Sequence, residues 1–229
     1  MVDIYSKYRI QDLKRKVEKI GVYPLDVMVT GITGAGKSTT LNAFFQSGVA
    51  SVGDGVDPKT MQIDAYSLNK VFRLWDTPGL GDGTAKDEQH KKRIVDLLHK
   101  TYFSNEVEFG FIDMVIVILD AGSRDLGTTY KLLNNIIIPN ISASRIFIAL
   151  NQCDMGMKGR YWNRRLNRPE TQLIDALEEK VVATQNRIFE ATGVRVRRPV
   201  YYSAEYSYNI DKLFDFIIDN APLEKRKLR

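Results

Sequence analysis

The stretch at residues 31–42, GITGAGKSTTLN, places three glycines, one lysine and four hydroxyl side chains in twelve positions. It fits the pattern G-x-x-x-x-G-K-[ST], in which glycines let successive backbone N–H groups turn inward around an anion. An apolar run, LDVMVTG, ends in this loop, and a helical pattern that ends near Gly48 follows it. Because the phosphate-binding pattern requires strand, loop and helix in this order, the stretch predicts a site for a nucleoside triphosphate.

The side chains of this loop can divide the contacts with a triphosphate among themselves. Lys37 can reach the β and γ phosphates, and the Ser38 hydroxyl can bind Mg²⁺. The helix that begins here directs the positive end of its dipole at the same place. A flexible strand-to-helix turn with a chance lysine is the alternative. The expected nucleotide contacts of the loop are Gly34, Ala35, Gly36, Lys37, Ser38 and Thr39.

The composition narrows the class of protein. With 229 residues and 44% hydrophobic content, the chain suits one well-buried domain. No apolar run approaches the roughly 20 residues of a membrane-spanning helix, and the charged N-terminus lacks the apolar stretch of a signal peptide, so we expect a cytoplasmic protein. The single cysteine, Cys153, excludes an internal disulfide, and with two histidines there are too few soft ligands for structural zinc. Any metal is therefore expected to be a hard cation bound by oxygen.

Strand patterns alternate with helical patterns along the chain. The runs DMVIVILD and RIFIALNQ are almost continuously apolar, as in parallel strands that helices cover on both faces. MQIDAYSL and KVFRLWDTPG predict two neighbouring strands that pair. The alternation predicts a doubly wound α/β domain whose ligand lies beyond the carboxyl ends of the strands. Helices are expected at residues 4–20, 86–102, 127–137, 170–191 and 209–220, and the chain is expected to divide into an amphipathic N-terminal helix (1–21), one domain (22–220) and a basic tail (221–229).

Three polar segments that follow predicted strands indicate the rest of the ligand site. WDTPGLGDG places Asp76 where a carboxylate can hold a Mg²⁺-bound water and Gly79 where its N–H can meet the γ-phosphate, although an ordinary β-turn explains DTPG equally well. In NQCD, Asp154 can accept the two N–H donors on the edge of guanine, a pair that adenine lacks, while Asn151 fixes the loop. A plain polar turn is the alternative there. YYSAE ends the last strand, where the N–H of Ala204 can meet the base carbonyl.

The order and spacing of these segments resemble those of a known family. The series GITGAGKS, Thr60, DTPG, NQCD and SAE resembles the five guanine-nucleotide motifs of translation-factor-class P-loop GTPases. The segments GAGKSTTLNAFF, WDTPGLGDG, LDAGSRDLGTTY and ALNQCDMGMKGRYW are similar to bacterial Era-like GTPases often labelled ribosome-binding GTPases. Over about residues 22–220 the resemblance implies a P-loop GTPase domain that hydrolyses GTP. It also implies a six-stranded, mostly parallel sheet with one antiparallel edge strand, helices on both faces, and two loops that order around the γ-phosphate.

The resemblance implies a role for each residue that matches a motif. Lys37, Thr60 and Gly79 are expected to be catalytic, and Ser38, Thr60 and Asp76 are expected to bind the Mg²⁺ that accompanies GTP or GDP. Thr60, in GVDPKT, matches the switch threonine that contacts Mg²⁺ when GTP is bound, although an ordinary loop turn also explains this segment. The expected guanine contacts are Asn151, Gln152, Asp154, Ser203 and Ala204.

Three positions depart from the patterns of related GTPases. Gln152 replaces the usual lysine of N-K-x-D, which removes a charge but keeps a methylene stem that can cover the nucleotide. Gly34 stands where relatives that use potassium carry an asparagine, and Leu80 stands where Ras-like enzymes have a glutamine that orients water. Asp82, Gln89 and His90 are nearby in sequence, but a solvated switch loop accounts for them. We therefore expect slow intrinsic hydrolysis that a partner, or a second copy across the nucleotide face, accelerates.

Two other functions stay open from the sequence. Leu80 is compatible with a GTP-binding assembly module that has negligible hydrolysis. The phosphate loop alone is compatible with a P-loop phosphotransferase such as a small-molecule kinase, which has no use for NQCD and SAE. Residues 158–168 contain no acid and form either a solvated face or the surface for an acidic partner, such as a protein, RNA or membrane lipid. The cations of this stretch are Lys158, Arg160, Arg164, Arg165 and Arg168.

Overall fold

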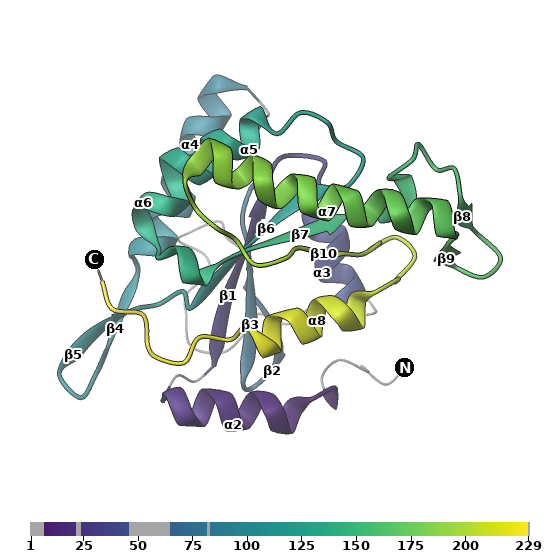
Figure 1. The fold of residues 1–229 in the computed structure, drawn as a ribbon. Coiled ribbons are helices and arrows are strands. Elements are labelled where there is room, and N and C mark those ends of the chain that lie inside the picture. The colour runs from purple at the N-terminus through teal and green to yellow at the C-terminus, as the bar shows by residue number, and fades with distance from the viewer. Residues whose placement is uncertain (1–6, 22–23, 46–64, 82, 229) are drawn as a thin grey trace.

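The computed structural model describes residues 7–21, 24–45, 65–81 and 83–228. Their centre is a six-stranded sheet in the order β10-β7-β6-β1-β3-β2 (Figure 1). β2 is antiparallel to β3, and the other neighbouring strands run parallel. This topology confirms the α/β fold class and the antiparallel edge strand. The strands are β1 (Leu25–Gly31), β2 (Ala65–Asn69), β3 (Phe72–Asp76), β6 (Met114–Asp120), β7 (Ile146–Asn151) and β10 (Val200–Tyr201).

The central strands are buried on both faces, which explains their continuous apolar sequences. Side chains alternate along β1, so Met28 packs into one core while Val27 and Val29 pack into the other. Helices cover both cores, on the two sides of the sheet (Figure 1). On the side of Met28 these are α4 (Thr84–His99), α5 (Gly127–Leu132) and α7 (Thr171–Thr192); on the other side they are α2 (Ile10–Ile20), α3 (Lys37–Phe45) and α8 (Ile210–Asp219).

The predicted helix at residues 86–102 extends too far. α4 ends at His99, and the chain then forms a hairpin of β4 (Thr101–Ser104) and β5 (Val107–Gly110) that projects from the domain (Figure 1). Asn105 and Glu106 make the turn with positive φ angles of 52° and 65°. Three further short elements also lie outside the predictions: α6 (Ile138–Asn140), and a second hairpin of β8 (Trp162–Asn163) and β9 (Arg168–Pro169).

The amphipathic N-terminal helix α2 packs against the domain. Leu13 and Val17 are fully buried, and Gly21 ends the helix with a φ angle of 70°. Arg9, just before α2, forms ion pairs with Asp215 and Asp219 of α8 at 2.8 and 2.7 Å. The described helices include none that is both long enough and apolar enough to cross a membrane.

Candidate functional site

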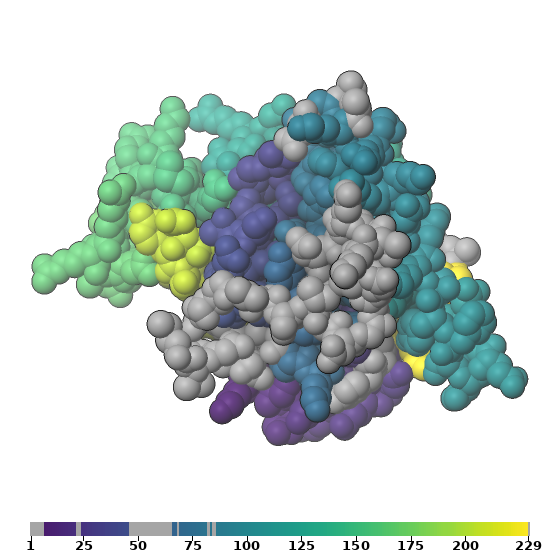
Figure 2. All heavy atoms as spheres, turned by 180° about the vertical axis from the view of Figure 1, so that it is seen from behind, coloured from purple at the N-terminus to yellow at the C-terminus, as the bar shows by residue number. Residues whose placement is uncertain are grey.

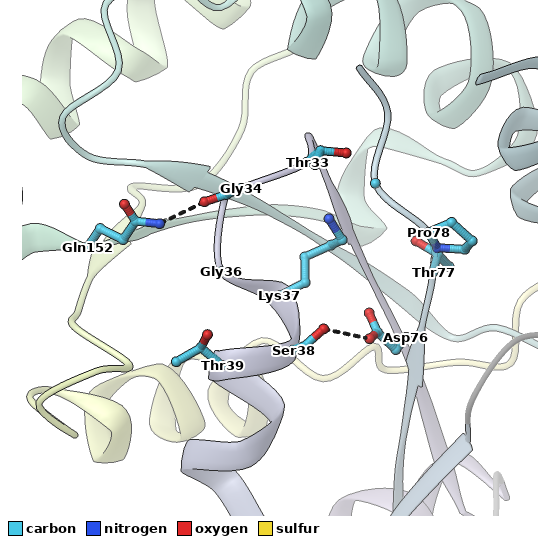
Figure 3. Close-up of a pocket in the computed structure, with 11 residues that line it drawn as sticks. Thr33, Gly34, Gly36, Lys37, Ser38, Thr39, Asp76, Thr77, Pro78 and Gln152 are labelled. Carbon is cyan, nitrogen blue, oxygen red and sulfur yellow. Dashed lines mark hydrogen bonds between the residues drawn. The ribbon is translucent and has the colours of Figure 1, made fainter. Parts of the chain in front are cut away.

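The carboxyl ends of three parallel strands bring most of the expected site residues to one edge of the sheet. β1 ends at Gly31, β3 at Asp76 and β7 at Asn151. The loops after them surround a cavity of about 540 Å³ (Figure 3). Its lining residues are Thr33, Gly34, Gly36, Lys37, Ser38, Thr39, Asp76, Thr77, Pro78, Gly79 and Gln152.

Lys37 is the first residue of α3 and extends its side chain into the cavity (Figure 3). Its ammonium group donates to the carbonyls of Ile32 and Gly31 at 3.0 and 3.3 Å, and only 8% of the residue is exposed. The charge is therefore held within the phosphate loop. A phosphate oxygen can replace a carbonyl as its acceptor, because hydrogen bonds between two charged groups are stronger.

Two of the three expected Mg²⁺ ligands lie side by side. The Ser38 hydroxyl, from α3, donates to Oδ2 of Asp76, at the end of β3, at 3.4 Å (Figure 3). Hydroxyl and carboxylate oxygens are the ligands that Mg²⁺ prefers, so this pair fits the cation. Thr60, the third expected ligand, lies outside the described residues.

Two glycines of the site leave no room for a side chain. A Cβ atom on Gly36, whose φ angle is 82°, would overlap Nδ2 of Asn151. A Cβ atom on Gly79 would lie 2.6 Å from Oγ1 of Thr33 and 2.7 Å from the Lys37 ammonium nitrogen. Glycine at these positions thus allows the phosphate loop to contact both neighbouring loops.

The segment after DTPG packs against the start of the phosphate loop. The Thr33 N–H donates to the Leu80 carbonyl at 2.8 Å, and the Leu80 side chain is 4% exposed within the hydrophobic core. Leu80 therefore offers no polar group to the cavity. Nδ1 of His90 lies 2.7 Å from the Gly79 carbonyl oxygen and carries the proton, because that oxygen can only accept.

Asn151 joins the phosphate loop to the last strand. Its Nδ2 donates to the carbonyl of Ala35 at 3.0 Å, and its Oδ1 accepts the N–H of Ala204 at 3.0 Å. The amide thus joins three loops at once. The predicted contact between Ala204 and the base stays a prediction. Ser203 is fully buried, and its backbone pairs with Tyr208.

The next residues of the NQCD segment differ in their surroundings. Gln152 adopts a left-handed conformation with φ 58° and donates from Nε2 to the Gly34 carbonyl at 2.8 Å (Figure 3). This glutamine therefore contacts the phosphate loop without a charge. Cys153 is fully buried, and burial raises the pKa of its thiol, so it serves as a small neutral filler.

Asp154 has an oxygen suited to a ligand. The residue is 7% exposed, and among the described residues its Oδ1 has no hydrogen-bond partner. Buried polar atoms are normally hydrogen-bonded, so an N–H donor from a bound molecule fits this position.

Several residues of the site were not predicted from the sequence. Thr33, Thr77 and Pro78 line the cavity at positions that the motifs leave variable. They could have been included because they lie within or beside the motif segments. The contact between His90 and Gly79 joins two elements, and no local pattern signals it.

Comparisons with known proteins agree with this geometry. A model of the 50S ribosome-binding GTPase family matches residues 26–152. Interferon-gamma-inducible GTPase 10 of Mus musculus is 37% identical over 76 residues, which span 31% of this chain but only 18% of that protein.

Solved structures share the fold at low sequence identity. Toc33 from Arabidopsis thaliana in complex with Mg²⁺ and GMPPNP aligns with a TM-score of 0.62 at 13% identity, over 96% of this chain and 93% of that chain. A dimerization-deficient mutant of Toc33 also aligns, with a TM-score of 0.62 at 14% identity, over the same shares of the two chains. A GTP-binding protein from Sulfolobus solfataricus in complex with GDP aligns with a TM-score of 0.52 at 17% identity, over 93% of this chain and 57% of that chain.

Proposed function

The chain belongs to the 50S ribosome-binding GTPase family, and on that premise we propose how its residues divide the work of binding and hydrolysing GTP. The protein is a GTP-binding switch, and the family match gives no support to the phosphotransferase alternative. In our proposal residues 34–39 hold the phosphates. Asp154 selects guanine, supported by Asn151, Gln152, Ser203 and Ala204. The observation that carries the assignment is the buried Asp154 oxygen, which lacks a partner among the described residues.

We propose that Ser38 and Asp76, together with Thr60, hold the Mg²⁺ that accompanies the nucleotide. The 3.4 Å approach of the Ser38 and Asp76 oxygens beside the cavity supports this assignment. When bound, the cation acts as a Lewis acid and neutralises charge on the phosphate oxygens.

We propose that hydrolysis proceeds by positioning and charge stabilisation. The Lys37 ammonium leaves the carbonyls of Gly31 and Ile32 and donates to the phosphates, and the Gly79 N–H donates to the γ-phosphate. Water attacks the γ-phosphorus in line with the leaving oxygen. Because Leu80 is buried, residue 80 does not supply a glutamine-like group for that water.

Asp154→Asn tests the assignment of guanine recognition. The amide can donate to the extra carbonyl of xanthine, where the carboxylate had accepted a guanine proton, so we expect preference to move from GTP to XTP. Competition against a fluorescent guanine nucleotide should show GTP affinity falling at least about tenfold. Asp175→Asn, on the exposed surface of α7, is the matched control. A variant that still prefers GTP to XTP would remove Asp154 from base recognition.

We propose that the β8–β9 hairpin is a partner surface beside the nucleotide site. Residues 158–168 carry five cations and no acid, and they lie at the edge of the molecule (green in Figure 2). Trp162 anchors the hairpin through ring contacts with Tyr206 and Tyr208. Leu166 is 54% exposed. Such a surface suits an acidic protein face or RNA.

Charge reversal tests this surface. Arg164→Glu combined with Arg165→Glu should weaken partner capture by the GTP-bound protein at least about tenfold. The two substitutions replace cations that attract an acidic partner with anions that repel it. GTP affinity should stay unchanged. Lys14→Glu combined with Lys19→Glu, on α2, makes the same change in net charge elsewhere and should capture normally. Equal capture by both double variants would identify residues 158–168 as a solvated face.

We also propose that a second copy can pair across the nucleotide face. Toc33 has the same fold, and a mutant of it is described as dimerization-deficient, which supports this proposal by analogy.

A further inference from the structure

Tyr202 directly follows the last strand, β10, and its backbone contacts the NQCD loop at residues 151–154, which we call the guanine-selecting loop. It is fully buried and directly precedes Ser203 and Ala204. Its N–H donates to the Leu150 carbonyl at 2.9 Å, and its carbonyl accepts the Cys153 N–H at 3.1 Å. These two bonds bracket the segment at residues 151–152 and end beside Asp154, so the backbone of Tyr202 fixes the place of the NQCD loop.

The side chain of Tyr202 reaches α3, the helix that follows the phosphate loop. Its hydroxyl lies 2.7 Å from Oγ1 of Thr40, in the first turns of α3. Oγ1 of Thr40 in turn donates to the Gly36 carbonyl at 2.8 Å. Thr40 has one hydroxyl proton and gives it to Gly36, so Tyr202 must donate to Thr40. Burial raises the pKa of the Tyr202 phenol, which keeps this donor protonated.

The chain of hydrogen bonds ends inside the phosphate loop. The Gly36 carbonyl also accepts the Thr40 N–H at 2.9 Å and lies 3.4 Å from Nδ2 of Asn151. Gly36 directly precedes Lys37. Successive hydrogen bonds polarise one another, and in a buried site each is costly to leave unmade. The route through Tyr202 and the route through Asn151 therefore connect the same two parts of the site.

We propose that Tyr202 is a positioning residue that sets the spacing between the guanine-selecting loop and the phosphate loop. The proposal rests on the function assigned to these two loops above. GTP spans both loops, so it binds tightly only when the carboxylate that reads the base and the donors that hold the phosphates are at the matching separation. The Tyr202 hydroxyl holds α3 at that separation from a position that touches neither base nor phosphate.

Tyr202→Phe removes only the hydroxyl. We expect the affinity for GMPPNP to fall about fivefold and the preference for GTP over ITP to fall about threefold, because ITP lacks the exocyclic amino group that meets Asp154. A loss of general stability lowers the melting temperature but leaves the GTP-to-ITP ratio unchanged. Tyr201→Phe is the matched control, since it removes the neighbouring hydroxyl, which hydrogen-bonds Glu178 instead of α3.

A double-mutant cycle completes the test. Thr40→Val breaks the same series of hydrogen bonds from the α3 side. The double variant should therefore bind GMPPNP no more weakly than whichever single variant binds it more weakly. An unchanged GTP-to-ITP ratio in Tyr202→Phe, an equal loss in Tyr201→Phe, or additive losses in the cycle would each overturn the proposal. If Asp154→Asn fails to move preference toward XTP, the proposed function fails. If only the Tyr202 variants behave like the wild type, the positioning role alone fails.

Discussion

Gly79 is held between side chains from three elements. His90 of α4 contacts its carbonyl, and the Thr33 hydroxyl and the Lys37 ammonium lie beside its Cα. Leu80, the next residue, is buried. The polar side chain that follows the corresponding glycine in Ras-like enzymes is therefore replaced here by the packing of Leu80 in the core.

Asp113 gives a pH dependence that can be measured at one residue. Burial raises its pKa from an ordinary value of 3.8 to about 7. The hydrogen bond from the Asp26 N–H and the charges of Arg145 and Arg226 act to lower this pKa, and the charge of the Asp26 side chain acts to raise it. Between about pH 4 and pH 7 the folded state therefore keeps a proton that the unfolded chain has lost. The stability that this carboxyl contributes at low pH is lost as the pH rises through this window, at a rate of up to about 1.4 kcal/mol per pH unit.

Asp113→Asn should remove this dependence. The amide oxygen can still accept the Asp26 N–H, which Oδ2 of Asp113 accepts at 2.9 Å, but it cannot titrate. We expect the variant to be more stable than the wild type at pH 8, and the difference to be smaller at pH 5 and to vanish near pH 4, as measured by urea unfolding. Asp96→Asn, exposed on α4, is the control. A pH slope identical to that of the wild type would show that Asp113 is already ionised in the folded protein at pH 5.

At the level of elements, the segment after α8 packs against the ends of two helices. Arg226 is 5% exposed, and its guanidinium donates to the carbonyls of Leu98 and Asn140, at the carboxyl ends of α4 and α6. Its own carbonyl accepts the N–H of Gly110, at the end of β5. A cation at a helix carboxyl end is favourable, and here one side chain satisfies two ends.

Arg226→Ala should therefore destabilise the protein by about 3 kcal/mol, because two buried carbonyls lose their donor. The free energy of unfolding in urea measures this directly. Lys227→Ala changes the next residue, which is exposed, and should be neutral within about 0.5 kcal/mol. Equal stability of the two variants would mean that Arg226 contributes no more than its neighbours in the basic tail that the sequence predicts at residues 221–229.

The elements with strong local patterns could be predicted from the sequence, and those fixed by pairing could not. β1, the phosphate loop and α3 follow from one motif, and β6 and β7 follow from continuous apolar runs. The β4–β5 hairpin was missed because its turn, Asn105 and Glu106, lacks the glycine that usually signals positive φ angles. The β8–β9 hairpin has two residues in each strand, and ring contacts of Trp162 with Tyr206 and Tyr208 stabilise it. The residues in these ring contacts are far apart in the sequence, so no local pattern signals the hairpin.

The residues of the site show the same contrast between local motifs, which could be predicted, and tertiary contacts, which could not. Lys37, Ser38, Asp76 and Asn151 were predicted because their motifs have fixed spacing and follow strands. The links between motifs were not, since the contacts of His90 with Gly79 and of Tyr202 with Thr40 depend on how α4 and β10 pack against the rest of the domain. A sequence motif specifies which groups meet a ligand, and tertiary packing specifies their spacing.

For the whole molecule, the arrangement of the site predicts slow hydrolysis in isolation. Lys37 and the loop N–H groups can stabilise charge, but the buried Leu80 leaves the attacking water without a guide of the Ras-like kind. We expect intrinsic turnover well below about 1 per second, with acceleration when a partner or a second copy supplies a group across the nucleotide face. Leu80→Gln should not raise the rate, because the new amide would enter the core in place of an apolar side chain and destabilise the protein.

Single-turnover phosphate release tests this prediction as a property of the assembled molecule. A series of protein concentrations separates self-stimulation from intrinsic rate, since only the former increases with the population of paired copies. Measuring the series in sodium and in potassium tests the consequence of Gly34, which stands where an asparagine would organise potassium, so the two cations should give equal rates. A rate above about 1 per second that is independent of protein concentration would show that the isolated chain holds a complete catalytic site. The water would then have to be oriented by a group other than residue 80, because the Leu80 side chain is buried in the hydrophobic core.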